Sequence, residues 1–315
     1  MSVAALLGAV AAITAVLVNR GVGPLPDPEE CVATVGDHTV EITVEQAENA
    51  ALITAISVRR GLPARAASIA LATAFQESKL LNLEYGDRDS LGLFQQRPSQ
   101  GWGTRKQILN PVFATNAFYD ALERVPGYTE LRITEAAQRV QRSAYPEAYE
   151  AHAQDARVLA SALTGETTGG GFHCVVQGWP TETRTQLDRT GLTARAGAVR
   201  REVRRIFGDQ SWGGFAPGGV TSGHMPGSAH YEGRAIDILL RPVSAANRRQ
   251  GWAIAGYLVA QADRLEIAHV IYDGRIWSRG SRSEQGWRDY TPPAGSSGDQ
   301  DVLDHRDHVH VDVAP

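Results

Sequence analysis

The feature of this sequence that most restricts its fold is the stretch DHRDHVHVDV near the end of the chain. Three of the nine histidines lie in it, and valines alternate with polar residues from His308 to Val313. A period of two is typical of a half-buried β-strand, which would place His308, His310 and Asp312 on one face and the valines on the other. A solvated tail or a purification tag would not need this alternation. A strand face that carries two imidazoles and a carboxylate indicates a metal site.

Length and charge set broad limits on the rest of the chain. At 315 residues it is long enough for two domains, each with a sizeable hydrophobic core. A formal net charge of −4 gives no reason to expect a nucleic-acid partner. These quantities leave the oligomeric state open.

The N-terminus carries an uninterrupted apolar run over residues 3–18. The run is about as long as the shortest membrane spans and longer than the apolar part of most signal peptides. We therefore expect residues 1–20 to be a membrane anchor or an uncleaved signal, followed by a linker over residues 21–38, with the remainder outside the cytoplasm. A buried core helix is the alternative, although the run adjoins the Pro-rich sequence GPLPDPEE. Arg20 follows the run and no Lys or Arg precedes it, which does not support an outward-facing anchor.

The two cysteines of the chain, Cys31 and Cys174, flank the region that we expect to be the first domain. In an oxidising compartment, a disulfide between them would close that domain at its base. Two unrelated buried thiols are the alternative.

A helical region extends to about residue 163. Its sequence PARAASIALATAFQESKL has a proline at a helix start and then small apolar residues on nearly every side, which is typical of a helix in a helical core. Glu77 lies near the end of this helix, where a carboxylate is costly unless it stays protonated or finds a partner. A structural ion pair with Arg88 or Arg97 is the alternative to a catalytic role. An irregular polar segment follows, and then two further helices at NPVFATNAFYDAL and VQRSAYPEAYEAHAQDARVLASAL.

The order of Glu77-Ser78, Asn82, the segment GLFQQ at residues 92–96 and a tyrosine-bearing helix resembles the lysozyme-like lytic transglycosylases. The resemblance implies an all-α lysozyme-like domain over residues 39–163 that cleaves the glycan strands of peptidoglycan, with Glu77 as the acid. It implies that the substrate contacts Ser78, Asn82, Gln95, Gln96, Tyr145 and Tyr149. Lytic transglycosylases need one catalytic Glu because the 6-hydroxyl of the substrate attacks. A hydrolase would need a second carboxylate, for which the candidates are Glu84, Asp87 and Asp89.

A second region begins after GETTGGG, the clearest linker of the chain, which lies within an expected linker over residues 164–184. Beyond it, the sequence predicts helices at ARAGAVRREVRRIF and AANRRQGWAIAGYLVAQADRL and strands at AIDILL and IAHVIYD. We therefore expect a domain of mixed helix and strand over residues 185–315.

Two motifs in this region resemble the M15 and related zinc peptidases, which trim peptidoglycan peptides. Residues 228–237 read SAHYEGRAID, and the chain ends with three histidines spaced as H-x-x-H-x-H. The resemblance implies an α+β fold with a small antiparallel sheet and a Zn²⁺ ion held by His230, Asp237 and His310, with a fourth position open to water. It implies His308 as the catalytic base and His305 as an assisting residue. Candidates for holding an imidazole in one tautomer are Asp307 and Asp312.

The remaining histidines are predicted to be structural. His224 is close to the first motif and is interpreted as a loop residue. Four others stand alone in the sequence: His38, His152, His173 and His269.

The two resemblances together predict a bifunctional peptidoglycan hydrolase that cleaves glycan strands and peptide stems or cross-links. It would act on the extracytoplasmic face of the cell membrane or be secreted to the cell wall. A wall-binding or scaffold protein that retains a metal site without catalysis is the alternative. A metal-handling membrane protein is a third hypothesis, but the chain lacks the polar spans that a transporter needs.

Overall fold

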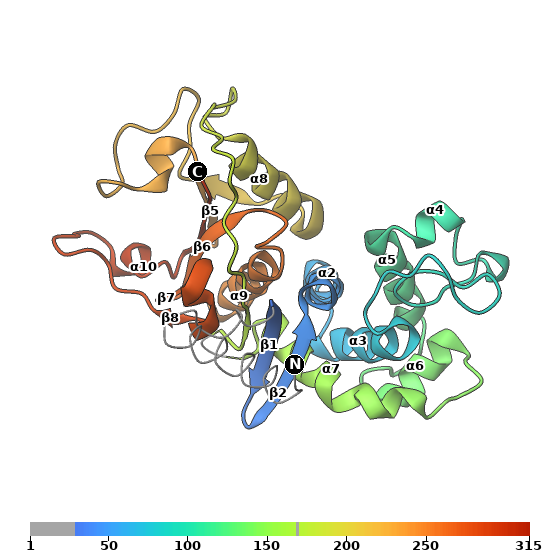
Figure 1. The fold of residues 1–315 in the computed structure, drawn as a ribbon. Coiled ribbons are helices and arrows are strands. Elements are labelled where there is room, and N and C mark those ends of the chain that lie inside the picture. The colour runs from blue at the N-terminus through green and yellow to red at the C-terminus, as the bar shows by residue number, and fades with distance from the viewer. Residues whose placement is uncertain (1–28, 168–169) are drawn as a thin grey trace, which may run out of the picture.

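The computed structural model describes residues 29–167 and 170–315, which form a helical half and a mixed half in contact with each other (Figure 1). The α-helices of the helical half are α2 (Val44–Arg59), α3 (Ala64–Ser78), α4 (Arg105–Ile108), α5 (Pro111–Glu123), α6 (Ile133–Gln141) and α7 (Ala153–Leu163). The α-helices of the mixed half are α8 (Ala194–Phe207), α9 (Ala245–Ala260) and α10 (Gln300–Leu303). Short 3₁₀ helices are η1 (Pro98–Gln100), η2 (Ala148–His152), η3 (Ala229–Glu232) and η4 (Gly280–Gln285).

Helix α3 is the centre of the helical half. It contacts α2, α5, α6 and α7, and nearly all of its small apolar side chains are buried, as its sequence predicts. Helix α2 before it begins with a capping box, in which Thr43 and Gln46 each bond the other's backbone N–H. Glu77 lies in the last turn of α3 and is partly exposed to solvent.

The prediction that this half is all-α is wrong, because it carries a three-stranded antiparallel sheet. Strands β1 (Glu30–Val35) and β2 (His38–Thr43) form a hairpin, and β3 (Phe172–Cys174) pairs with the other edge of β1. The hairpin turns at Gly36 and Asp37 and buries alternate residues on each strand. This alternation across a Gly-Asp turn is a hairpin signal, but β1 and the turn lay in the segment that we interpreted as a linker, residues 21–38, and β2 began the predicted helical domain.

Nothing in the described ranges corresponds to the expected membrane segment. Among residues 29–167 and 170–315, no helix is both long and apolar enough to cross a bilayer. Residues 1–20, where we predicted an anchor or an uncleaved signal, lie outside the described residues.

The mixed half is built on a six-stranded antiparallel sheet in the order β4-β5-β9-β6-β7-β8. Its strands are β4 (Ser211–Gly213), β5 (Ala235–Leu239), β6 (Ile267–Tyr272), β7 (Arg275–Ser278), β8 (Arg288–Asp289) and β9 (His308–Val313). The last strand of the chain therefore lies inside the sheet, between β5 and β6. Helix α9 packs against β6 and β9 on one side and against α2 and α7 on the other, so its residues from Gly251 to Ala260 are buried on every face.

The segment expected as a linker, residues 164–184, contains β3, which is bonded to both halves by a disulfide and by hydrogen bonds. Cys174 on β3 forms a disulfide with Cys31 on β1, the pairing that we expected. From the mixed half, the indole N–H of Trp277 donates to the carbonyl of Cys174 and that of Trp287 donates to the carbonyl of Phe172. Buried apolar residues of both halves form one continuous hydrophobic core.

Candidate active sites

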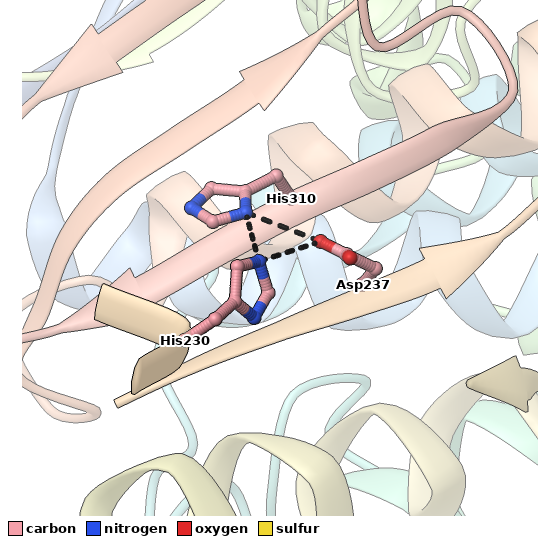
Figure 2. Close-up of side chains that lie close together, drawn as sticks. All are labelled: His230, Asp237 and His310. Carbon is pink, nitrogen blue, oxygen red and sulfur yellow. Dashed lines mark hydrogen bonds and ion pairs between the residues drawn. The ribbon is translucent and has the colours of Figure 1, made fainter. Parts of the chain in front are cut away.

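Three of the predicted metal ligands meet in the mixed half, at the centre of its sheet. Asp237 on β5 and His310 on β9 are directly paired across the two strands. His230 comes from η3, just before β5, where the Ser228 hydroxyl caps the 3₁₀ turn. Figure 2 shows the three side chains pointing toward one another, and we call them the central triad.

The spacing of the central triad suits a small metal ion. His230 Nε2 lies 3.1 Å from His310 Nδ1 and 3.3 Å from Asp237 Oδ1, and the last two atoms are 3.1 Å apart. A tetrahedral Zn²⁺ with bonds of about 2.0–2.1 Å separates its ligand atoms by about 3.3 Å. The three atoms therefore stand where three vertices of such a tetrahedron would be, and the fourth vertex is left to another ligand.

The far sides of the two imidazoles determine which nitrogen faces the centre. His230 Nδ1 lies 2.7 Å from the carbonyl oxygen of Gly214, which can only accept, so Nδ1 carries the proton. His310 Nε2 faces the carboxylate of Asp312 at 3.3 Å and donates to it in the same way. In the neutral rings, both remaining nitrogens then present lone pairs to the centre beside the Asp237 oxygen. A bound cation would satisfy all three converging acceptors, as would a proton on His310 Nδ1.

Gly214 allows this arrangement by its lack of a side chain. A Cβ atom at this position would lie 2.2 Å from His230 Cε1 and 2.8 Å from Asp237 Oδ2. Its φ of +78° also lies in the region that favours glycine. The residue thus lets the backbone approach closely enough for its carbonyl to fix the His230 ring.

The electrostatics of the central triad favour positive charge. Burial by itself raises the pKa of the Asp237 carboxyl, but hydrogen bonds with His230 and His310 outweigh burial and hold it well below its ordinary value. Burial lowers the pKa of the His310 imidazole, whereas hydrogen bonds with Asp237 and Asp312 raise it more strongly, to about 9. Two carboxylates therefore stabilise a cation at this point of the sheet.

His308 lies beside the central triad but is not one of its converging groups. Its Nδ1 donates to Asp307 Oδ1 at 2.6 Å, and its Nε2 lies 3.8 Å from Asp237 Oδ1, beyond hydrogen-bond distance. Asp307 is in turn held by Arg241 Nε at 2.7 Å. His308 thus has an orienting carboxylate on one side and a free nitrogen facing the triad.

His305 packs against the same group of rings. Its ring centroid is 4.7 Å from that of His308, and Tyr290 meets its other side edge-on at 4.8 Å. Burial lowers the pKa of the His305 imidazole to about 3, so the ring is neutral at physiological pH. It can act as a neutral acceptor or donor at the rim of the site.

Two further histidines line this site: His224, which lies in a loop as predicted, and His269, which we interpreted as structural. His224 stacks on His230 with ring centroids 4.0 Å apart. His269 on β6 is paired across the sheet with Asp312, and its Nδ1 donates to that carboxylate at 2.9 Å. The sequence predicts that IAHVIYD is a strand. It does not show that this strand pairs with β9, which is what brings His269 next to Asp312.

An open cleft of about 900 Å³ surrounds the central triad. Its lining combines the polar site with partly exposed apolar side chains, among them Trp179, Met225 and Val302. The loops around residues 225 and 296 meet across it, where the Ser296 hydroxyl contacts Met225 Sδ at 3.7 Å. The cleft is large enough for several residues of an extended peptide.

Glu77, the predicted acid of the helical half, has a hydroxyl rather than a cation as its partner. The phenol of Tyr149 donates to Glu77 Oε1 at 2.8 Å. Burial raises the pKa of the Glu77 carboxyl, and hydrogen bonds from Tyr149 and Gln141 only partly offset the rise. The alternative ion pairs are not formed: Arg97 contacts Asp89 at 2.7 Å, and Arg88 lies 3.9 Å from Asp87.

The other residues predicted to contact glycan mostly hold the polar segment in place. The Ser78 hydroxyl donates to the Leu93 carbonyl, the Asn82 amide to the Leu109 carbonyl and the Gln96 amide to the Ala114 carbonyl. Gln95 donates to the carbonyls of Tyr85 and Gly92. Tyr145 is 75% exposed and lies outside the helix in which we placed it, whereas Tyr149 is buried in η2. Of this set, Tyr149 is the one that contacts Glu77.

A comparison with protein families matches part of the mixed half. Residues 188–301 match the family model described as VldE, C-terminal domain, which covers about a third of the chain. The match includes His230 and Asp237 and ends before His305, His308 and His310. A search of curated proteins found no match to the chain.

Proposed function

We propose that the mixed half is a zinc-dependent peptidase that cleaves the peptide stems or cross-links of peptidoglycan. The observation that carries the proposal is the convergence of three lone-pair atoms 3.1–3.3 Å apart, with the outer nitrogens of both imidazoles donating to fixed acceptors. An open fourth vertex and a cleft of peptide size support a catalytic site over a closed structural one.

The residues around the central triad have separable roles in this proposal. The central triad would hold a zinc ion, which would supply Lewis-acid polarisation of the peptide carbonyl and activation of a water molecule. His308 Nε2 accepts the proton that the water releases and returns it to the leaving amine. Asp307 fixes the tautomer of His308, because its carboxylate accepts from Nδ1, and Arg241 holds Asp307 in place. His305 orients the substrate at the rim.

Zinc content and product release together test the peptidase. Purified protein should contain one zinc ion per chain by elemental analysis, and mass spectrometry should show peptides released from cell walls that disappear when a chelator is added. His310→Ala should lose zinc and release together, whereas His38→Ala, on the distant hairpin, should keep both. Zinc bound at full occupancy with no peptide released would favour the wall-binding or scaffold alternative.

We propose a second activity for the helical half, the cleavage of peptidoglycan glycan strands with Glu77 as proton donor. Its support is the raised pKa of Glu77 together with the absence of a cationic partner at Glu77 among the described residues. Glu77→Gln keeps the shape of the side chain and removes the proton, so it should abolish glycan cleavage. Glu84→Gln tests a candidate second carboxylate, and Glu130→Gln, at an exposed residue outside the polar segment, is the matched control. Loss of activity in both Glu77→Gln and Glu84→Gln would indicate a two-carboxylate hydrolase, and anhydro-sugar products with loss only in Glu77→Gln would indicate a lytic transglycosylase.

We infer that the protein acts outside the cytoplasm, at the cell membrane or in the wall. The disulfide between Cys31 and Cys174 supports this placement, because such bonds persist in oxidising compartments.

A further inference from the structure

A second cleft, of about 620 Å³, lies where helices α5 and α6 end. Its charged lining residues are Arg124, Arg139 and Arg142, and no acidic residue lines it. Arg124 follows the last residue of α5, and Arg139 and Arg142 lie at the end of α6. We call this cavity the arginine cleft. It is locally basic in a chain whose net charge is −4.

The three guanidinium groups of the arginine cleft have no ion pair within the described part of the chain. Glu123 pairs with Arg60 and Glu147 with Arg132, and Glu135, four residues before Arg139 on α6, forms no ion pair with it. A cation at a helix C-terminus is favourable by about 0.3–1 kcal/mol, which gives each arginine a modest structural reason to be there. All three side chains are exposed, so water solvates their charges, and an anionic ligand in the cavity can reach them.

The arginine cleft adjoins the proposed glycan-cleaving residue. Gln141 lines the cleft and donates its amide to the carbonyl of Phe94 at 2.8 Å. Its helix, α6, packs against α3, which carries Glu77, and Gln141 lowers the pKa of the Glu77 carboxyl. A ligand in the cleft would therefore lie close to Glu77. Trp102 also lines the cleft and supplies an apolar surface.

We propose that the arginine cleft binds the carboxylates of the peptide carried by the glycan strand, so that the helical half selects strands that still bear their peptides. The substrate identity rests on the glycan cleavage proposed above. Three arginines suit this ligand, because the planar guanidinium binds carboxylates through two parallel hydrogen bonds and stays charged. A peptide stem with several carboxylates can engage more than one of them, and its aliphatic parts can pack on Trp102.

Binding of a soluble probe tests the proposal without requiring turnover. The probe is the disaccharide tetrapeptide unit of peptidoglycan, titrated into full-length Glu77→Gln protein by calorimetry, beside the same unit with its carboxylates converted to amides. We expect the free-carboxylate probe to bind about tenfold more tightly, the effect of one charge-assisted hydrogen bond. In the same background, R124Q/R139Q/R142Q should lose this preference.

A second triple variant, R189Q/R201Q/R282Q, removes the same charge from three exposed arginines outside the cleft and should keep the preference. Equal binding of the two probes by the Glu77→Gln protein overturns the proposal. This result does not depend on whether R124Q/R139Q/R142Q folds. Loss of the preference in the control triple also overturns it. Displacement of the probe by inorganic phosphate at lower concentration than by acetate would assign the cleft to a phosphate polymer instead.

Product release separates failure of this proposal from failure of the proposed function. His310→Ala protein, which lacks the proposed peptidase, should release sugar fragments faster from peptide-bearing glycan than from glycan stripped of its peptides. Equal release from both substrates overturns the role of the arginine cleft and leaves glycan cleavage intact. Absence of release with probe binding retained overturns glycan cleavage and leaves the binding site.

Discussion

Replacing Tyr149 with Phe should raise the pKa of the Glu77 carboxyl. The phenol donates a 2.8 Å hydrogen bond to Oε1, which stabilises the ionised form, and the substitution removes this donor while keeping the buried ring. A hydrogen bond to a charged group contributes about 1.5–3 kcal/mol. Since one pKa unit corresponds to about 1.4 kcal/mol, and Glu77 is only partly buried so that water can replace the donor, we expect a rise of about one unit.

The direction of the change in activity follows from the protonation state that the reaction needs. An acid catalyst works protonated, so the rate of glycan cleavage should fall as the pH rises through the pKa of Glu77. In Tyr149→Phe, the pH at which the rate of glycan cleavage falls by half should therefore be higher by about one unit.

Carboxyl-carbon NMR titration measures the pKa directly, and the pH dependence of kcat/KM gives the kinetic counterpart. Tyr145→Phe is the matched control, because Tyr145 is exposed and makes no contact with Glu77 in the structure. A pKa that stays unchanged or falls in Tyr149→Phe, or that rises equally in the control, would refute the reasoning.

Three further outcomes follow from the mixed half and its junction. His310→Ala should lose zinc and peptidase activity together, whereas His308→Ala should keep zinc and lose peptide cleavage; equal zinc loss in both, by elemental analysis, would indicate a closed structural site. Gly214→Ala should weaken zinc affinity by about 10–100-fold, because its Cβ would displace a triad imidazole; unchanged affinity in a competition titration would contradict the fixed ring. Replacing both Cys31 and Cys174 with Ala should lower the free energy of unfolding by about 2–5 kcal/mol in chemical denaturation, and an unchanged value would show that the junction is held by its other contacts.

The sequence predicted individual elements well wherever a periodic pattern lay within one segment. Helix α8 occupies the predicted stretch from Ala194 to Phe207, and β9 occupies the alternating stretch from His308 to Val313. The convergence of His230, Asp237 and His310 was expected because the two motifs resemble those of zinc peptidases, and the resemblance implies these three residues as ligands. Their antiparallel pairing, with Asp237 opposite His310, then follows from the sheet.

What the sequence left out depends on contacts between distant segments. The pairing of β1 with β3 joins residues on opposite sides of the helical region, and no local pattern records it. His269 reaches the site only because β6 neighbours β9, and Gly214 only because β4 neighbours β5. The arginine cleft likewise needs two helix ends to meet. The β1–β2 hairpin is different, since its alternating strands and Gly-Asp turn were readable in the sequence.

The position of β3 has a consequence for anyone who cuts this protein into fragments. A piece comprising residues 39–163 would lack β1 and β3, and β2 would lose its only partner in the described sheet. A piece that kept β1 without β3 would expose an unpaired strand edge and the free thiol of Cys31, two features that promote aggregation and intermolecular cross-linking. Expression boundaries should therefore retain residues 29–35 together with 172–176, even where only the helical half is wanted.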